Sequence, residues 1–79
     1  LLLHHKFDAC SFTAPGEVPH LAQALSGATS VTIRMVEGGA KWRGDPCHPF
    51  HAHGFPGIES KVLADIAAWI KTVAAGKTP

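Results

Sequence analysis

An aspartate and a histidine that could carry acid–base chemistry each follow a stretch of apolar or alternating sequence in this chain. Asp8 comes shortly after the apolar run that opens the sequence, and His53 lies in a long segment rich in glycine, proline and histidine. A carboxylate beside an imidazole can fix the tautomer of the ring and stabilise the imidazolium that forms during acyl transfer. The two residues therefore predict a general base, His53, that is oriented by Asp8.

The elements that would have to position this pair read as strand, helix, strand and helix. Residues 1–5 form an apolar run typical of a buried strand, and residues 30–36 alternate between apolar and polar side chains, as a strand with one polar face does. Residues 18–26 and 58–75 predict helices, with Gly27 and Gly76 expected at their C-terminal ends. This order predicts an α/β fold, β-α-β-α, with two parallel strands and two helices.

The last helix has the clearest pattern. Its expected inward face consists of Ile58, Val62, Ile66, Ile70 and Val73, widened by Leu63 and Trp69, and Asp65 and Lys71 are expected in water.

The parallel order brings the two candidate residues together. Segments that follow parallel strands leave the sheet at its carboxyl edge, where open α/β sheets place their ligand sites. Asp8 and His53 are 45 positions apart in the sequence, yet we expect them within hydrogen-bond or one-water distance at this edge. The segment 37–57, which carries His53, is long for a strand-to-helix connection, and such loops are usually functional or disordered.

These features resemble the C-terminal part of the α/β-hydrolase family. The stretch L-L-L-H-H-K-F-D, ending at Asp8, is similar to the strand and turn that present the acid in that family. H-G-F-P-G-I-E, starting at His53 and followed by an amphipathic helix, looks like its histidine loop and final helix. The resemblance covers nearly the whole chain and implies that residues 1–79 form a partial α/β-hydrolase sheet. It also implies serine-type hydrolysis of an ester or related acyl bond, and no cofactor.

The nucleophile of such a hydrolase is not evident in this sequence. The family order is nucleophile, acid and histidine, and no G-x-S-x-G occurs here. The chain opens within an apolar run, and its one methionine is Met35. We therefore expect a C-terminal fragment of a hydrolase domain, with the serine and the oxyanion hole in sequence before Leu1. By itself the chain is expected to hydrolyse no ester at a triad-like rate, because both of those parts would be missing.

The two cysteines predict a disulfide. Cys10 follows Asp8, Cys47 precedes His53, and both lie in segments expected at the same edge of the sheet. A bond between them would tether the acid to the histidine and would favour an oxidising compartment, such as a periplasm or the cell exterior. Two reduced thiols are the alternative.

The density of metal-ligating side chains gives a second functional hypothesis, a small metal-binding or interaction module. The spacing is poor for zinc, which usually takes paired ligands from two separated clusters. The candidate ligands are Cys47, His48, His51 and His53, completed by Cys10, Asp8, His4 or His5. A third hypothesis is a hydrolase remnant without catalysis. A G-x-S-x-G upstream of Leu1 would favour the first hypothesis over the other two.

Charge and hydropathy narrow the range of partners. Seven basic and six acidic side chains are scattered singly and give a net charge of +1, so no basic patch indicates nucleic acid. No apolar run approaches the ~20 residues of a membrane span. The expected partners are a small-molecule ester or acyl substrate and the remainder of the hydrolase domain. Self-association is expected where that remainder is absent, because the first strand would expose unpaired backbone groups.

Overall fold

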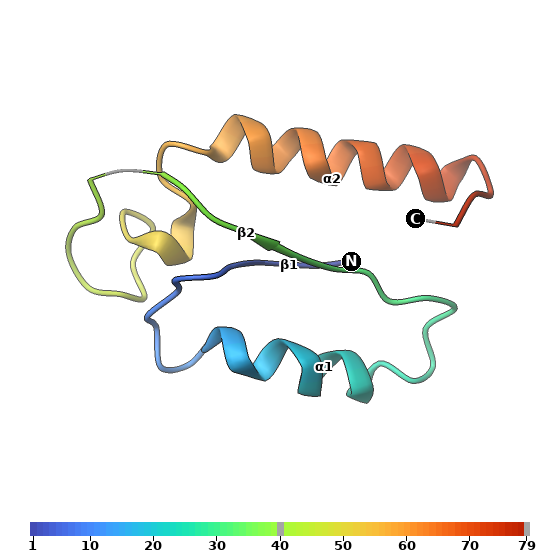
Figure 1. The fold of residues 1–79 in the computed structure, drawn as a ribbon, viewed down its shortest axis with the longest axis horizontal. Coiled ribbons are helices and arrows are strands. Elements are labelled where there is room, and N and C mark those ends of the chain that lie inside the picture. The colour runs from blue at the N-terminus through green and yellow to red at the C-terminus, as the bar shows by residue number, and fades with distance from the viewer. Residues whose placement is uncertain (40, 79) are drawn as a thin grey trace.

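The computed structural model describes residues 1–39 and 41–78 and has two parallel strands between two helices. Along the chain the elements are β1 (Leu2–His5), η1 (Pro15–Glu17), α1 (Val18–Ala24), β2 (Ile33–Val36), η2 (Ala52–Gly54) and α2 (Glu59–Ala74), where η marks a short 3₁₀ helix. The helices lie on opposite sides of the strand pair (Figure 1). The predicted α/β order is therefore confirmed.

The register of the strand pair determines which side chains share a face. Leu2 pairs with Ile33 and His5 pairs with Val36, so the strands end together. Because side chains alternate along a strand, His4 and His5 lie on opposite faces. The α2 side is identified by the Trp69 indole of α2, which donates a hydrogen bond of 3.0 Å to Thr32 Oγ1, just before β2.

Helix α2 turns inward only part of the face that the sequence predicts. Val62 is buried and Ile58, Ile66 and Trp69 are half-buried, as expected. Leu63, Ile70 and Val73 of the predicted face are instead 66%, 54% and 42% exposed. Asp65, expected in water, is half-buried and accepts a hydrogen bond of 2.8 Å from Lys61. The prediction was wrong for Leu63, Ile70, Val73 and Asp65. Apolar side chains cover more than half of the helix, and α2 places Asp65 on the same inward side as Trp69, which bonds to Thr32.

The two predicted helix ends differ in outcome. Gly76 is left-handed (φ +73°), its N–H bonds to the Val73 carbonyl and the Lys77 N–H bonds to the Thr72 carbonyl, which together form a Schellman motif. Gly27 is not in the left-handed region, so the prediction of a glycine cap for α1 was wrong. That helix ends earlier, at Ala24, where the Leu25 N–H bonds to the Ala22 carbonyl.

The best-packed part of the molecule is the carboxyl end of the sheet. The buried residues are Val36 and His5 at the strand ends, Asp8 and Cys10 after β1, Val18 at the start of α1, Ala52 in η2 and Val62 in α2. The molecule as a whole is elongated and flat: its Cα atoms extend 40 × 26 × 14 Å, with a radius of gyration of 13.6 Å. A compact domain of this length would have a radius of about 12 Å.

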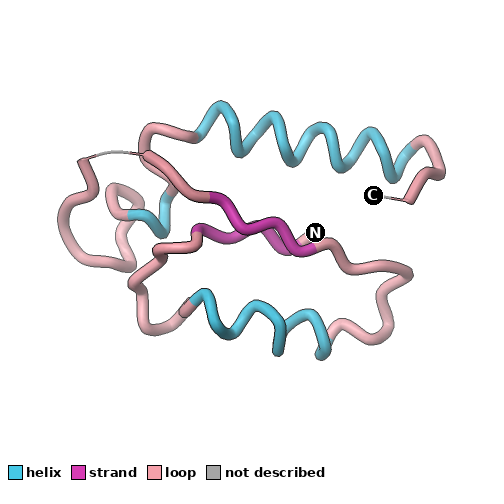
Figure 2. The backbone as a smooth tube through the Cα atoms, in the orientation of Figure 1, coloured by secondary structure: helices cyan, strands magenta, loops and turns pink. Residues whose placement is uncertain are grey.

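Figure 2 shows the loops that leave the strands at this well-packed end and continue into the helices. We call residues 6–14 the acid loop and residues 37–57 the histidine loop. None of the helices in the described part of the chain is long and apolar enough to cross a membrane.

Candidate active site

The acid loop buries the carboxylate of Asp8 and fixes its direction. The loop turns directly after β1, where the Asp8 N–H donates to the His5 carbonyl at 3.2 Å. The Cys10 N–H then donates to Asp8 Oδ1 at 2.9 Å, a side-chain-to-backbone bond typical of aspartate in a turn. The Asp8 side chain is only 1% exposed. Its second oxygen, Oδ2, is the one directed at the histidine loop.

His53 reaches Asp8 from η2. Its Nδ1 lies 3.0 Å from Asp8 Oδ2, so the expected approach of the two side chains is confirmed. The ring is 31% exposed, and its Nε2 forms no hydrogen bond with any residue that the structure describes. An imidazole that donates through Nδ1 carries an unprotonated Nε2 when neutral, which is the atom a general base uses.

Two further side chains belong to this site although the sequence did not single them out for it. Thr13 Oγ1 donates to Asp8 Oδ2 at 2.9 Å and lies 3.0 Å from His53 Nδ1. His4 Nε2 lies 2.9 Å from the same Asp8 oxygen. A hydroxyl a few residues beyond the acid was a weak signal for Thr13, and His4 was indistinguishable in sequence from its neighbour His5.

The environment keeps Asp8 ionised. Burial raises the pKa of the Asp8 carboxyl, but hydrogen bonds from the Cys10 N–H, His53 and Thr13, with the charge of His53, outweigh burial and leave the pKa below its ordinary value of 3.8. An ionised carboxylate accepts the Nδ1–H of His53 and stabilises the imidazolium.

Backbone contacts within the histidine loop hold His53 in place. A Cβ on Gly54 would collide with the backbone of Pro49, so the residue after His53 can only be glycine without a shift of the chain. Phe55 follows in the left-handed region (φ 59°), which is costly for a bulky side chain. These features define a tight turn directly behind the histidine.

Aromatic packing connects this turn to β1. The buried His5 ring donates through Nε2 to the Gly38 carbonyl at 2.9 Å and accepts the Phe7 N–H through Nδ1 at 3.0 Å. The ring lies edge-on to Trp42 at 5.3 Å and 6.3 Å from Phe55. Trp42 and Phe55 therefore anchor the histidine loop to the strand that carries the acid loop.

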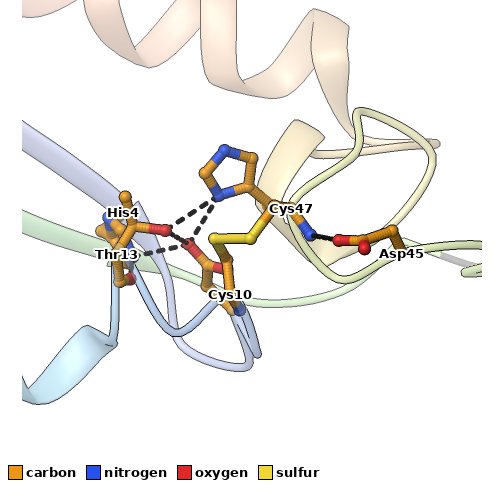
Figure 3. Close-up of a disulfide and its surroundings, with 7 residues drawn as sticks. His4, Cys10, Thr13, Asp45 and Cys47 are labelled. Atoms are coloured by element: carbon orange, nitrogen blue, oxygen red, sulfur yellow. Dashed lines mark hydrogen bonds and ion pairs between the residues drawn. A yellow bond between two sulfur atoms is a disulfide. The ribbon is translucent and has the colours of Figure 1, made fainter.

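The predicted disulfide is present and joins the two loops. Cys10 and Cys47 are bonded, with Cα atoms 4.7 Å apart (Figure 3). In the same view His4 and Thr13 lie to one side of the bond and Asp45 to the other, where Asp45 accepts the Cys47 N–H at 2.8 Å. The bond covalently links the acid loop, which carries Asp8, to the histidine loop, which carries His53.

A hollow of about 210 Å³ opens beside the acid loop. It is lined by His4, Phe12, Thr13, Ala14, Glu17, Val18 and Leu21. Thr13 and His4 are shared between this hollow and the Asp8–His53 pair, so a mainly apolar surface adjoins the site.

Neither cysteine can act as a thiolate ligand of the metal site considered above, because both are bonded in the disulfide. Within residues 1–39 and 41–78, no group of three or more histidine, cysteine, aspartate or glutamate side chains is placed to hold a metal ion.

No protein family, curated protein or solved structure matches this chain. The geometry of the site is therefore what indicates its chemistry.

Proposed function

We propose that this chain supplies the acid and the histidine of a serine-type α/β-hydrolase that cleaves an ester or a related acyl bond. The observation that carries the proposal is the hydrogen bond of 3.0 Å between His53 Nδ1 and the buried Asp8 carboxylate. This bond leaves Nε2 of His53 available, as the chemistry requires.

In the proposed reaction His53 Nε2 removes the proton from a serine hydroxyl as that oxygen attacks the acyl carbon. His53 then returns the proton to the leaving alcohol, and it repeats the two transfers with water to release the acid. Asp8 stays ionised throughout, holds the tautomer and stabilises the imidazolium. Thr13, which donates to Asp8 Oδ2, keeps that oxygen aimed at the ring.

The proposal assigns the serine and the oxyanion donors to another part of the hydrolase domain. The exposed apolar side chains support this assignment, because such surfaces usually mark contacts. On α2 they are Leu63 and Ile70, and on α1 they are Leu21 and Leu25. Cys10 is excluded as an alternative nucleophile within the chain, since its sulfur is bonded to Cys47.

The test uses the full coding sequence that contains this chain, a nitrophenyl ester and a fluorophosphonate probe that labels activated serines. We expect His53→Ala to lower kcat by a factor of about 10⁴ or more and to abolish labelling, and Asp8→Asn to lower kcat by up to about 10⁴. His48→Ala is the matched control, because His48 is an exposed histidine of the same loop.

Full activity in His53→Ala, or no hydrolysis and no labelling in the unaltered protein, contradicts the proposal. The 79 residues alone should be inactive. Ester hydrolysis by this chain alone that disappears in His53→Ala would place a nucleophile inside it, and Ser11 of the acid loop would then be the first candidate.

A further inference from the structure

The carboxylate of Asp8 has one more polar neighbour than a catalytic acid needs. Oδ1 takes the Cys10 N–H, and Oδ2 is within 3.0 Å of Thr13 Oγ1, His53 Nδ1 and His4 Nε2. Each carboxylate oxygen offers about two lone-pair sites, and three polar atoms lie around Oδ2. Two imidazoles thus share one oxygen, and the role proposed above uses only one of them.

The protonation of His4 follows from its second contact. His4 Nε2 lies 2.7 Å from the carbonyl oxygen of Thr13, which can only accept, so Nε2 carries the proton. The same nitrogen lies 2.9 Å from Asp8 Oδ2, an ion-pair distance, while its N–H bonds to the Thr13 carbonyl. His4 is therefore bonded to the backbone of the acid loop and lies against the acid. Its neighbour His5 lies on the other face of β1 and bonds instead to Gly38 and Phe7.

We propose that His4 is a positioning residue, which shares the Asp8 carboxylate with His53 and limits how strongly that carboxylate favours the His53 imidazolium. This inference rests on the proposed function of the Asp8–His53 pair. The partial positive charge of an N–H group close to a carboxylate lowers the proton affinity of that carboxylate and weakens its pull on a second cation. His53 must accept a proton and then release it, and its basicity is best set near the working pH.

The groups around His4 define the controls. From the acid loop it faces Asp8, and from η1 it faces Glu17, which lines the same hollow and pairs with His20 of α1 at 3.0 Å. From β2 its register partner is Met35, which carries no charge. Beyond Asp8 lies His53 of η2. Among the described residues, Glu17 is thus the charged side chain on the α1 side whose effect has to be separated from that of His4.

The test is an NMR titration of His53 in the full-length protein labelled with ¹³C and ¹⁵N in histidine. The His53 signals are assigned by their loss in His53→Ala. His4→Phe removes the donor and keeps a ring, whereas His4→Gln places an amide N–H near the position of Nε2. We expect His4→Phe to raise the pKa of His53 by about half a unit to one unit and His4→Gln to leave it within about 0.2 units. Glu17→Gln should also leave it unchanged.

Several results overturn the inference. These are a His53 pKa that stays constant or falls in His4→Phe, a shift in His4→Gln equal to that in His4→Phe, or an equal shift in Glu17→Gln. If His4→Phe does not fold, the unaltered protein still decides the question, because ¹⁵N shifts must show His4 protonated at Nε2 and unprotonated at Nδ1 at neutral pH. The opposite tautomer removes the donor and ends the proposal.

None of these measurements depends on hydrolysis, so their failure is distinguishable from failure of the proposed function. Coupled titration in a protein that no serine probe labels would retain the histidine–aspartate–histidine arrangement and reject the hydrolase. Labelling that requires His53 without the His4 effect would retain the hydrolase and reject the role of His4.

Discussion

Reducing the Cys10–Cys47 bond should remove a large part of the stability of this chain. The bond closes a loop with a sequence separation of 37, for which the loop-entropy relation gives about 4 kcal/mol at 25 °C. Small domains are stable by only about 5–15 kcal/mol. Here few side chains are buried, so the remaining interactions are poorly placed to offset the loss.

The expected effect is also local, because the bond lies beside the site. The N–H of Cys10 donates to Asp8 Oδ1, and Cys47 belongs to the loop that carries His53. Once the bond is reduced, the acid loop and the histidine loop are held together by hydrogen bonds and by packing around His5. We therefore expect the Asp8–His53 contact to loosen before the helices unfold.

Urea denaturation followed by tryptophan fluorescence measures the global effect, with and without a phosphine reductant. We expect the unfolding free energy to fall by about 2–4 kcal/mol on reduction. The control is a Cys10→Ser/Cys47→Ser double variant, which should match the reduced protein and ignore the reductant. A loss below about 1 kcal/mol, with complete reduction verified by mass, would refute the reasoning.

The remaining predictions concern the turn behind His53, the charge of Asp8 and the orientation of α2. Gly54→Ala should lower the unfolding free energy by about 1–3 kcal/mol, because the added Cβ meets the Pro49 backbone. Gly27→Ala is the control, since a Cβ there has open space, and equal denaturation midpoints for the two variants would contradict the prediction. Because the pKa of Asp8 is lowered on folding, its stabilisation is fully present above the unfolded value near 3.8 and is lost as the pH falls through the lower folded pKa. Melting temperatures should therefore drop less steeply below that pH in Asp8→Asn, and parallel curves would argue against an ionised, hydrogen-bonded Asp8. In chemical denaturation, Val62→Ala should lower the unfolding free energy by about 2 kcal/mol and Ile70→Gln by less than about 0.5 kcal/mol. A larger loss in Ile70→Gln than in Val62→Ala would show that α2 packs through the other face.

The order of elements and the pairing of the distant site residues could be predicted from the sequence, because both depend on local pattern and on one topological rule. The spacing of apolar residues and the positions of turn residues predict where the strands and helices lie, and parallel strands bring the loops that follow them to one edge of the sheet. That rule was enough to predict the contact of Asp8 with His53 and the bond between Cys10 and Cys47. Gly76 could be identified as a helix end because a left-handed cap is a local requirement.

Only the tertiary structure decided which face of α2 is buried and which side chains complete the site. An apolar surface wider than half of the helix leaves its exact rotation open, and the structure turns Asp65 inward together with Trp69, which bonds to Thr32 just before β2. Adjacent histidines look alike in sequence, yet the alternation of β1 directs His4 to Asp8 and His5 to Gly38. Thr13 joins the site because the acid loop folds back on Asp8. Such roles depend on direction in space, which neither residue type nor spacing specifies.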